Sequence, residues 1–341
     1  MKTHKHLWND FISAENFEIA ADHALRGKKS KISAKIFMRH REQKLARLRK
    51  SLKNGTYKTG QYRIFFVYEP KKRQVFMLPL YPDHIVHHAL INILGPIWQK
   101  LFISDSYACI PGRGLHEASH RCMQMLRRNK YVLQCDIRKF YPSIRHEIMI
   151  KILRRKIQDR RILKVLEDIV CSAYTECGMP IGNLTSQWMG NLYMNDLDMF
   201  IKHKLHVRDY IRYCDDFCLF ANDIETLRKW RNTLQEYLGK ELQLTFSKSF
   251  IKPTDAGISF IGYRHFKDYV ILTKAGVKKM KQNMRTLIQN REISAHSRSQ
   301  LAAFSGWMKW ARCNNLRRKF RSDARQTGDN AFIRFYNKYL Q

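Results

Sequence analysis

The spacing of hydrophobic and polar positions changes several times along this chain. Some stretches repeat apolar residues at helical spacing, whereas others are short apolar or alternating runs typical of strands. The predicted helical stretches are 1–60, 82–94, 116–128, 142–152, 151–170, 188–200, 223–240 and the part from 273 onward. The predicted strands are 62–68, 73–80, 131–136 and 242–248, with a hairpin at 211–220 and a short strand and turn at 259–263. Gly95-Pro96 is expected to end or kink the second helical stretch, and a Lys-rich turn at 69–72 joins the first two strands.

Charge narrows the class of partner. The 341 residues contain 63 Lys and Arg against 29 Asp and Glu, which gives a net charge of +34. So many positive side chains repel one another, so a polyanion such as nucleic acid is the simplest partner. A membrane surface is a weaker alternative. We find no run of eighteen apolar residues and no secretory signal after the basic N-terminus, and therefore expect a cytoplasmic protein without a membrane span.

The eight cysteines include no Cys-x-x-Cys pair, and several lie in strand-like runs, which favours reduced, buried thiols over a zinc site. The pairs His87-His88 and His116/His120 have spacings that a metal site can use. An ordinary helix surface is the favoured interpretation of both pairs.

Carboxylates provide the sharper chemical signal. In the stretch 211–220, two β-prone segments flank Cys214-Asp215-Asp216, which predicts a tight hairpin with two adjacent acids at its tip. A solvent-exposed polar turn is the alternative interpretation. The predicted strand 131–136 also ends in an acid, Asp136, 79 residues earlier (215 − 136). If Asp136 and the pair Asp215-Asp216 meet in one sheet, their carboxylate oxygens suit two Mg²⁺ ions that assist an in-line phosphoryl displacement.

At this point the sequence resembles the reverse transcriptases, with ordered motifs across about 60–310. The segment 136–141 resembles their first catalytic motif, and Tyr213-Cys214-Asp215-Asp216 resembles their Tyr-x-Asp-Asp box. The resemblance implies catalytic roles for Asp136, Asp215, Asp216 and Lys248, the last as a proposed general acid for pyrophosphate. It implies metal binding by Asp136, Ile137, Asp215 and Asp216, with two Mg²⁺ ions for which Mn²⁺ can substitute. It implies dNTP binding by Lys71, Lys72, Arg73, Ile137, Tyr141, Gly182 and Gln187, and a primer grip at Phe260, Gly262 and Tyr263.

The fold that the resemblance implies is α+β, a right-hand polymerase with an antiparallel-sheet palm, interleaved fingers and a helical thumb. The expected divisions are a basic helical region at 1–60, fingers and palm at 61–262, and a thumb at 263–341. In this family the place of Tyr141 holds an aromatic gate that excludes ribonucleotides. Because strand alternation lets only one of two neighbours face the site, Phe140 is the alternative; we favour Tyr141.

The loop 181–187 narrows the resemblance. Most reverse transcriptases carry Gln-Gly and then Ser-Pro here, whereas this chain has Ile181-Gly182 and Ser186-Gln187, as the enzymes of diversity-generating retroelements do. That type implies error-prone cDNA synthesis at template adenines in a bacterium or phage, with template RNA, a cDNA or primer, dNTPs and a small basic accessory protein as partners. Retron, group II intron-like and phage-defence enzymes are nearer alternatives. A non-catalytic RNA-binding protein is the alternative of another class.

Overall fold

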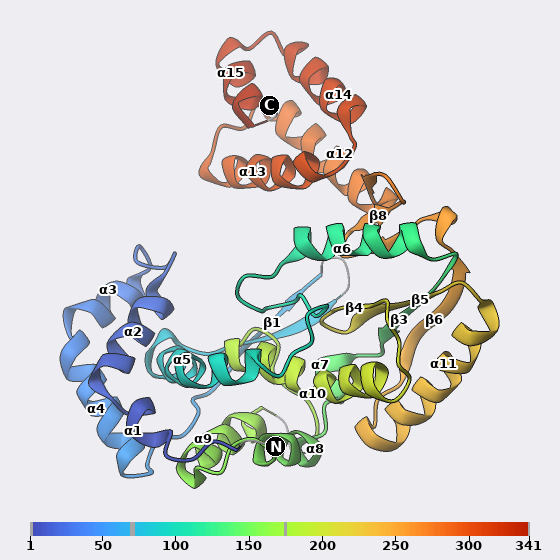
Figure 1. The fold of residues 1–341 in the computed structure, drawn as a ribbon. Helices are drawn as coiled ribbons and strands as arrows, with labels where there is room; N and C mark the ends of the chain where they lie inside the picture. Colours follow the sequence, from blue (N-terminus) through green and yellow to red (C-terminus); the bar gives the residue numbers. More distant parts are fainter. Residues whose placement is uncertain (1–2, 69–71, 174–175, 340–341) are drawn as a thin grey trace.

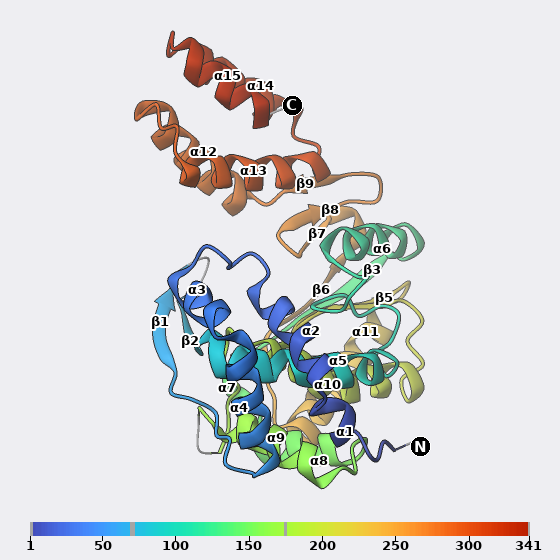
Figure 2. The same ribbon diagram turned by 90° about the vertical axis from the view of Figure 1, so that its left-hand side faces the viewer.

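A computed structural model of the chain describes residues 3–68, 72–173 and 176–339, and Figures 1 and 2 show it from two sides. The helices are α1 (Trp8–Phe11), α2 (Ala14–Leu25), α3 (Ile32–Arg39), α4 (Arg41–Lys53), α5 (Ile85–Gln99), α6 (Leu115–Arg128), α7 (Phe140–Ser143), α8 (His146–Arg154), α9 (Arg160–Cys171), α10 (Leu184–His203), α11 (Ile224–Tyr237), α12 (Lys274–Gln289), α13 (Ala295–Trp310), α14 (Asn314–Arg325) and α15 (Asn330–Tyr339). The strands are β1 (Arg63–Val67), β2 (Arg73–Met77), β3 (Tyr131–Ile137), β4 (Tyr210–Tyr213), β5 (Asp216–Ala221), β6 (Phe246–Pro253), β7 (Ile258–Phe260), β8 (Tyr263–His265) and β9 (Val270–Leu272). Shorter helical turns are η1 (Leu80–His84), η2 (Leu238–Leu242) and η3 (Thr254–Ala256).

A four-stranded antiparallel sheet in the order β4-β5-β3-β6 forms the centre of the molecule. Its side chains alternate between two faces, as the period of a strand requires. Leu133 and Cys135 belong to the large core that α10 and α11 complete, whereas Val132 belongs to a second core with α6 and β7. Figure 1 shows α6 on one side of this sheet and α10 and α11 on the other. Strands β3, β4 and β5 are therefore mostly buried, whereas most residues of the edge strand β6 are exposed or partly exposed.

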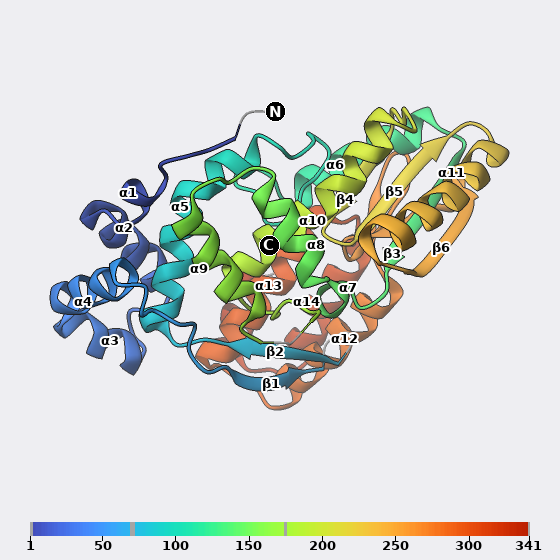
Figure 3. The ribbon, with the colours of Figure 1, turned by 90° about the horizontal axis from the view of Figure 1, so that it is seen from below.

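The N-terminal helices pack around α5. Trp8, Phe11 and Phe17 of these helices are buried, and Figure 3 shows that the N-terminal helices and α11 lie at opposite ends of the molecule. The helix α5 does not end at Gly95-Pro96 but continues through Pro96 to Gln99. The last turn is stabilised by the fully buried Trp98, whose ring lies 6.3 Å from that of Trp188.

Two predicted boundaries near the sheet are wrong. The helix expected from Pro142 is broken, because Ile144 and Arg145 are extended and separate α7 from α8. The strand expected at 242–248 is displaced. Leu242 ends a helical turn and is buried against the core, and the strand that pairs with β3 runs from Phe246 to Pro253. Burial of apolar side chains is common to helices and strands, so the pattern alone could not separate them.

The C-terminal part has its own core. Helices α12–α15 bury Met284, Phe320 and Tyr336 together with residues of the small sheet β7-β8-β9, and Figure 2 shows these helices standing above that sheet. The small sheet spans residues on both sides of the expected division at 262/263, which stays a prediction. Within the described ranges, no helix combines the length and the apolar character that crossing a bilayer requires.

Candidate active site

The predicted acidic hairpin is present at one end of the central sheet. The last residues that strands β4 and β5 pair before the turn are Tyr213 and Asp216, which lie opposite each other. Cys214 has a left-handed φ of +60° and starts the turn between the strands. Asp216 lies directly opposite Asp136 in the β3–β5 register, so the two side chains share one face of the sheet. The Ile137 N–H donates a hydrogen bond to the Asp215 carbonyl over 3.3 Å. The fold thus brings the turn and the end of β3 together, as the sequence predicted.

Burial and mutual repulsion govern the protonation of these acids. Burial, together with the negative charges of Asp136 and Asp215, raises the pKa of Asp216 to about 7, whereas Lys248 acts in the opposite direction. Burial also raises the pKa of Asp215, with Asp136 as the largest charge that adds to it. One oxygen of Asp216 is buried without a hydrogen-bond partner. A cation between the carboxylates would relieve all of these effects.

The donor chemistry therefore fits a hard divalent cation, but the side chains are not gathered around a common point. Across the described ranges, no three His, Cys, Asp or Glu side chains are close enough together to hold a metal ion. The Asp136 carboxylate instead accepts a hydrogen bond from the Ser247 hydroxyl. The favoured interpretation of the histidine pairs as an ordinary helix surface is wrong for His87, which is buried, whereas His116 and His120 are exposed and His116 stacks on Trp310.

A cavity of about 310 Å³ lies against the acids. Asp136, Asp216 and Lys248 line it, and Lys248 lies opposite Asp136 in the β3–β6 register. Ser259, which precedes the predicted primer grip, lines its other side. The structure therefore places Lys248 beside the acids, although in the third position of its strand rather than at the end of the predicted one.

A buried ion pair that we did not predict supports the hairpin. Arg212 and Asp198 are both completely buried, and their side chains form two hydrogen bonds of 2.6 and 2.8 Å. The same guanidinium donates to the Cys214 carbonyl over 2.9 Å and to the Asn191 side chain over 3.0 Å. Tyr210 donates its hydroxyl to Asp198 over 2.7 Å. Arg212 thus connects α10 to the turn that contains Cys214 and Asp215, here named the acidic turn.

The electrostatics of this pair agree with its geometry. Burial alone would lower the pKa of Arg212, but the Asp198 carboxylate outweighs that effect and raises it above the ordinary value. The sequence does contain a signal, because an Arg interrupts an otherwise apolar strand run directly before Tyr213. A charged residue in such a position needs a buried partner.

The structure orients Phe140 and Tyr141 differently. Phe140 is 3% exposed and belongs to the core, whereas Tyr141 is partly exposed, and its hydroxyl lies 3.7 Å from the Cys214 sulfur. Gly190 makes room for this ring, since a Cβ there would lie 3.3 Å from a Tyr141 ring carbon. Tyr141 is therefore the one of the two beside the acidic turn, and its role as a gate stays a prediction.

The β1–β2 hairpin contacts the loop that precedes α10. The Phe76 N–H donates to the Ile181 carbonyl over 2.8 Å. Gly182 has a φ of +115°, and a Cβ there would lie 3.0 Å from Val75. Gln187 is exposed in the first turn of α10. The loop is thereby fixed to the hairpin, with a glycine required at the contact.

The basic residues at the tip of this hairpin are partly described. Lys71 lies outside the described residues, together with Glu69 and Pro70 of the predicted turn at 69–72. Lys72 is exposed, and its ammonium lies 4.6 Å from the centre of the Phe66 ring. The charge of Arg73 lowers the pKa of Asp215, which indicates that this end of the hairpin faces the acids.

The predicted primer-grip residues differ in exposure. Phe260 and Tyr263 are each 1% exposed and pack in the core. Between them Ile261 and Gly262 have positive φ values of +49° and +84° and form a tight turn. The side chains of Phe260 and Tyr263 are therefore not available to a ligand, and the primer contact itself stays a prediction.

With this geometry in place, comparison with known proteins decides the family. The family model described as reverse transcriptase (RNA-dependent DNA polymerase) matches residues 69–265. The chain belongs to the reverse transcriptase family. The matched segment of this reverse transcriptase contains the β2 strand, α10 and all three acids, and the family's activity is RNA-directed DNA polymerisation, for which the family in general uses divalent metal ions.

Individual relatives of this reverse transcriptase are distant. It is 25% identical to protein YkfC of Escherichia coli over 269 residues, which are 64% of this chain and 70% of YkfC. It is 25% identical over 170 residues to the group II intron-encoded protein LtrA of Lactococcus lactis, covering 47% of this chain and 28% of LtrA. A 91 kDa protein in the cob intron of Schizosaccharomyces pombe is 29% identical over 136 residues, 17% of its length. The chain thus spans less than a third of these two intron proteins.

Proposed function

We propose that this chain copies an RNA template into DNA by two-metal nucleotidyl transfer at Asp136, Asp215 and Asp216. The observation that carries the proposal is the register of the central sheet, which sets Asp136 opposite Asp216 and next to the turn that contains Asp215. Burial, and after it the repulsion of neighbouring carboxylates, raises the pKa values of Asp215 and Asp216, which a bound cation would counteract. Mg²⁺ bound there would acidify a primer 3′-hydroxyl and neutralise the leaving pyrophosphate.

The surrounding residues have separate tasks in this proposal. Lys248 lines the same cavity as Asp136 and Asp216 and would protonate the leaving pyrophosphate. Lys72 and Arg73, with Lys71, would bind the triphosphate, since charged groups hold phosphate oxygens strongly. Tyr141 would lie under the sugar of the incoming nucleotide, where its ring excludes a 2′-hydroxyl. Gly182 and Gln187 would contact the new base pair from the start of α10.

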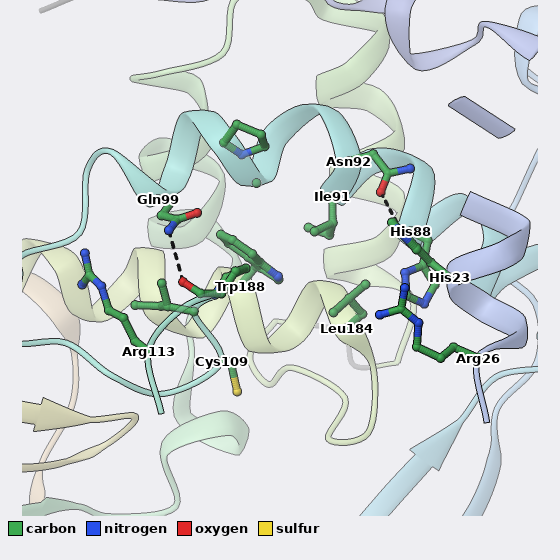
Figure 4. A pocket seen from close by; sticks show the side chains of 14 residues that line it. His23, Arg26, His88, Ile91, Asn92, Gln99, Cys109, Arg113, Leu184 and Trp188 are labelled. Carbon is green, nitrogen blue, oxygen red and sulfur yellow. Dashed lines mark hydrogen bonds between the residues drawn. The ribbon is translucent and has the colours of Figure 1, made fainter. Parts of the chain in front are cut away.

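A groove of about 630 Å³ between α5 and α10 supports RNA binding next to this site (Figure 4). Its floor is apolar and includes Leu184 and Trp188, and the basic side chains of Arg26 and Arg113 lie toward its two ends. Cys109 also lines the groove. An aromatic floor between cationic ends suits single-stranded template on its way to the turn.

For the subclass, we infer a diversity-generating retroelement from the loop 181–187. The carbonyl of Ile181 accepts a hydrogen bond from β2, and Gln187 is exposed in the first turn of α10. Ile181 and Gln187 stand where most reverse transcriptases have Gln and Pro. These replacements would change the packing against the templating base, on which fidelity depends. In such an element the enzyme would act with a small basic accessory protein. Group II intron-like synthesis is the second candidate, which the intron-encoded relatives favour.

An extension assay on a heteropolymeric RNA template with a DNA primer tests the activity. The proposal predicts templated incorporation of dNTPs with Mg²⁺ or Mn²⁺ and none after chelation by EDTA. RNA binding without incorporation under either metal would contradict it and favour the non-catalytic RNA-binding alternative. Sequencing of the products tests the subclass. Errors concentrated at template adenines, and reduced in Ile181→Gln, would support the retroelement assignment, whereas an even error spectrum unchanged by that substitution would contradict it.

A further inference from the structure

The last turn of α13 is attached to α6 through Trp310. The indole N–H of Trp310 donates a hydrogen bond of 2.8 Å to the Ser119 hydroxyl. The indole ring also stacks on His116, with ring centroids 4.5 Å apart and planes inclined by 4°. His116 and Ser119 are three residues apart in α6 and therefore lie on one face of that helix. One side chain of the C-terminal helices is thus fixed by two different interactions with one face of α6.

Ser119 extends this attachment to the small sheet. Its hydroxyl oxygen lies 2.7 Å from Nε2 of His265 in β8, and both residues are completely buried. Burial lowers the pKa of His265 to about 4, so the imidazole is neutral at pH 7 and can accept the Ser119 proton. A hydroxyl that accepts from Trp310 and donates to His265 joins α13, α6 and β8 in one chain of hydrogen bonds.

Trp307, one turn earlier in α13, covers the turn at residues 261–263. A Cβ on Gly262 would lie 2.8 Å from the Trp307 ring, and the rings of Tyr263 and Trp307 are 4.8 Å apart. The Tyr263 hydroxyl donates to the Trp307 carbonyl over 3.3 Å. Trp307 nevertheless remains 36% exposed. The same end of α13 therefore contacts the predicted primer grip and presents an aromatic surface beside it.

We propose that Trp310, Ser119, His116 and His265, here named the α13 latch, fix α12–α15 against α6 and so set the position of Trp307 and the turn 261–263 on a bound duplex. The inference rests on the proposed function in one respect, namely that this duplex is a primer–template. The four latch residues are positioning residues, because they act through Trp307 and the turn and not on the reacting atoms. The latch should govern how tightly and for how long the duplex is bound, and not the rate of bond formation.

Two substitutions separate the two interactions of the latch. Trp310→Phe keeps an aromatic ring against His116 but loses the N–H donor, whereas His116→Ala removes the stacked ring and leaves the hydrogen bond. Trp230→Phe in α11 is the matched control, since it makes the same chemical change in a partly buried Trp on another helix. The dissociation constant of a primer–template is measured without dNTP, and kcat, the KM for dNTP and the product length per binding event are measured with it.

Each latch variant is expected to weaken primer–template binding by about three- to tenfold, the effect of one lost hydrogen bond or stacked pair. Product length per binding event should fall, while kcat and the KM for dNTP at saturating primer–template stay within about twofold. The Trp230→Phe control should change none of these. Unchanged primer–template affinity in both latch variants would overturn the proposal. An increase in the KM for dNTP as large as the loss of primer–template affinity would also overturn it.

Hydrogen exchange tests the latch without reference to activity. In the free protein, Trp310→Phe should speed amide exchange in β8 and in the last turn of α13, while exchange in β3 and β5 stays unchanged. Exchange identical to that of the wild type in β8 and α13 would overturn the latch. An inactive wild type that nevertheless shows faster exchange in the variant would refute the proposed function and leave the latch supported, so the two failures are distinguishable.

Discussion

Replacing Arg212 by Met should destabilise the protein strongly, because it leaves Asp198 buried without its cation. Both side chains are completely inaccessible, and the guanidinium also serves the Cys214 carbonyl and Asn191. Removing one partner of such a pair costs about 3–5 kcal/mol, most of it from the uncompensated charge that stays behind. If charge is the cause, neutralising the carboxylate as well should restore stability. We therefore expect Arg212→Met/Asp198→Asn to recover about 2 kcal/mol, because Asn keeps an acceptor for Tyr210.

Urea unfolding followed by circular dichroism measures both effects as changes in the midpoint and in the free energy of unfolding. The matched control is Arg228→Met, which breaks an exposed ion pair with Glu225 and should cost less than about 1 kcal/mol. A loss below about 1 kcal/mol for Arg212→Met would refute the reasoning. A double variant that is no more stable than the single one would refute it too, since the buried charge would then not be the source of the cost.

Three further predictions concern acid stability, sugar selection and the loop before α10. Burial lowers the pKa of His87 to about 3, below its unfolded value near 6.5, so the unfolded chain binds the extra proton and stability falls as pH drops from 6.5 toward 3. The stability advantage of the wild type over His87→Gln should therefore shrink by about 1.4 kcal/mol per pH unit in urea titrations between pH 6 and 4.5, and a constant advantage would contradict this. Tyr141→Ala should raise the kcat/KM for ribonucleotides relative to deoxynucleotides by about 10- to 100-fold, and an unchanged ratio would exclude the ring as the gate. Gly182→Ala should lower the free energy of unfolding by about 1–3 kcal/mol and raise the KM for dNTP. Gly27→Ala, also at positive φ but in open space, should leave that KM unchanged. Equal effects of the two substitutions on the KM would contradict a specific role for the contact between Gly182 and β2.

Much of the central sheet could be predicted because its signals are local. The run that ends in Asp136 and the hairpin around Asp215 are recognisable from apolar patterning and turn chemistry alone, and the structure pairs them as expected. The sequence misplaces the strand that contains Lys248. Leu242 ends a helical turn and Leu244 lies in the segment after it, but both are buried, and their spacing in the sequence is also typical of a strand. Local pattern reports that a residue is buried, but not which neighbour buries it.

The supporting parts of the site depend on tertiary contacts and could not be predicted. The partner of Arg212 lies 14 residues away in α10, and that of Trp310 lies 191 residues away in α6. No periodicity connects such residues. The burial of Phe260 and Tyr263 shows the same limit, since motif order located the turn but not the direction of its side chains. What a sequence of this kind conveys best is the set of reacting groups, and what it omits is how they are held.

Single-turnover primer extension with Asp215→Asn tests the central claim most directly. The substitution keeps the size of the side chain and removes one carboxylate from the acidic turn. Asp223→Asn is the matched control, because Asp223 caps α11 outside the site and Asn caps helices equally well. With an RNA template, Mg²⁺ and saturating dNTPs, the account predicts that Asp223→Asn extends the primer at the wild-type rate and that Asp215→Asn loses at least about a thousandfold. Extension by Asp215→Asn at a rate close to that of the wild type would contradict it.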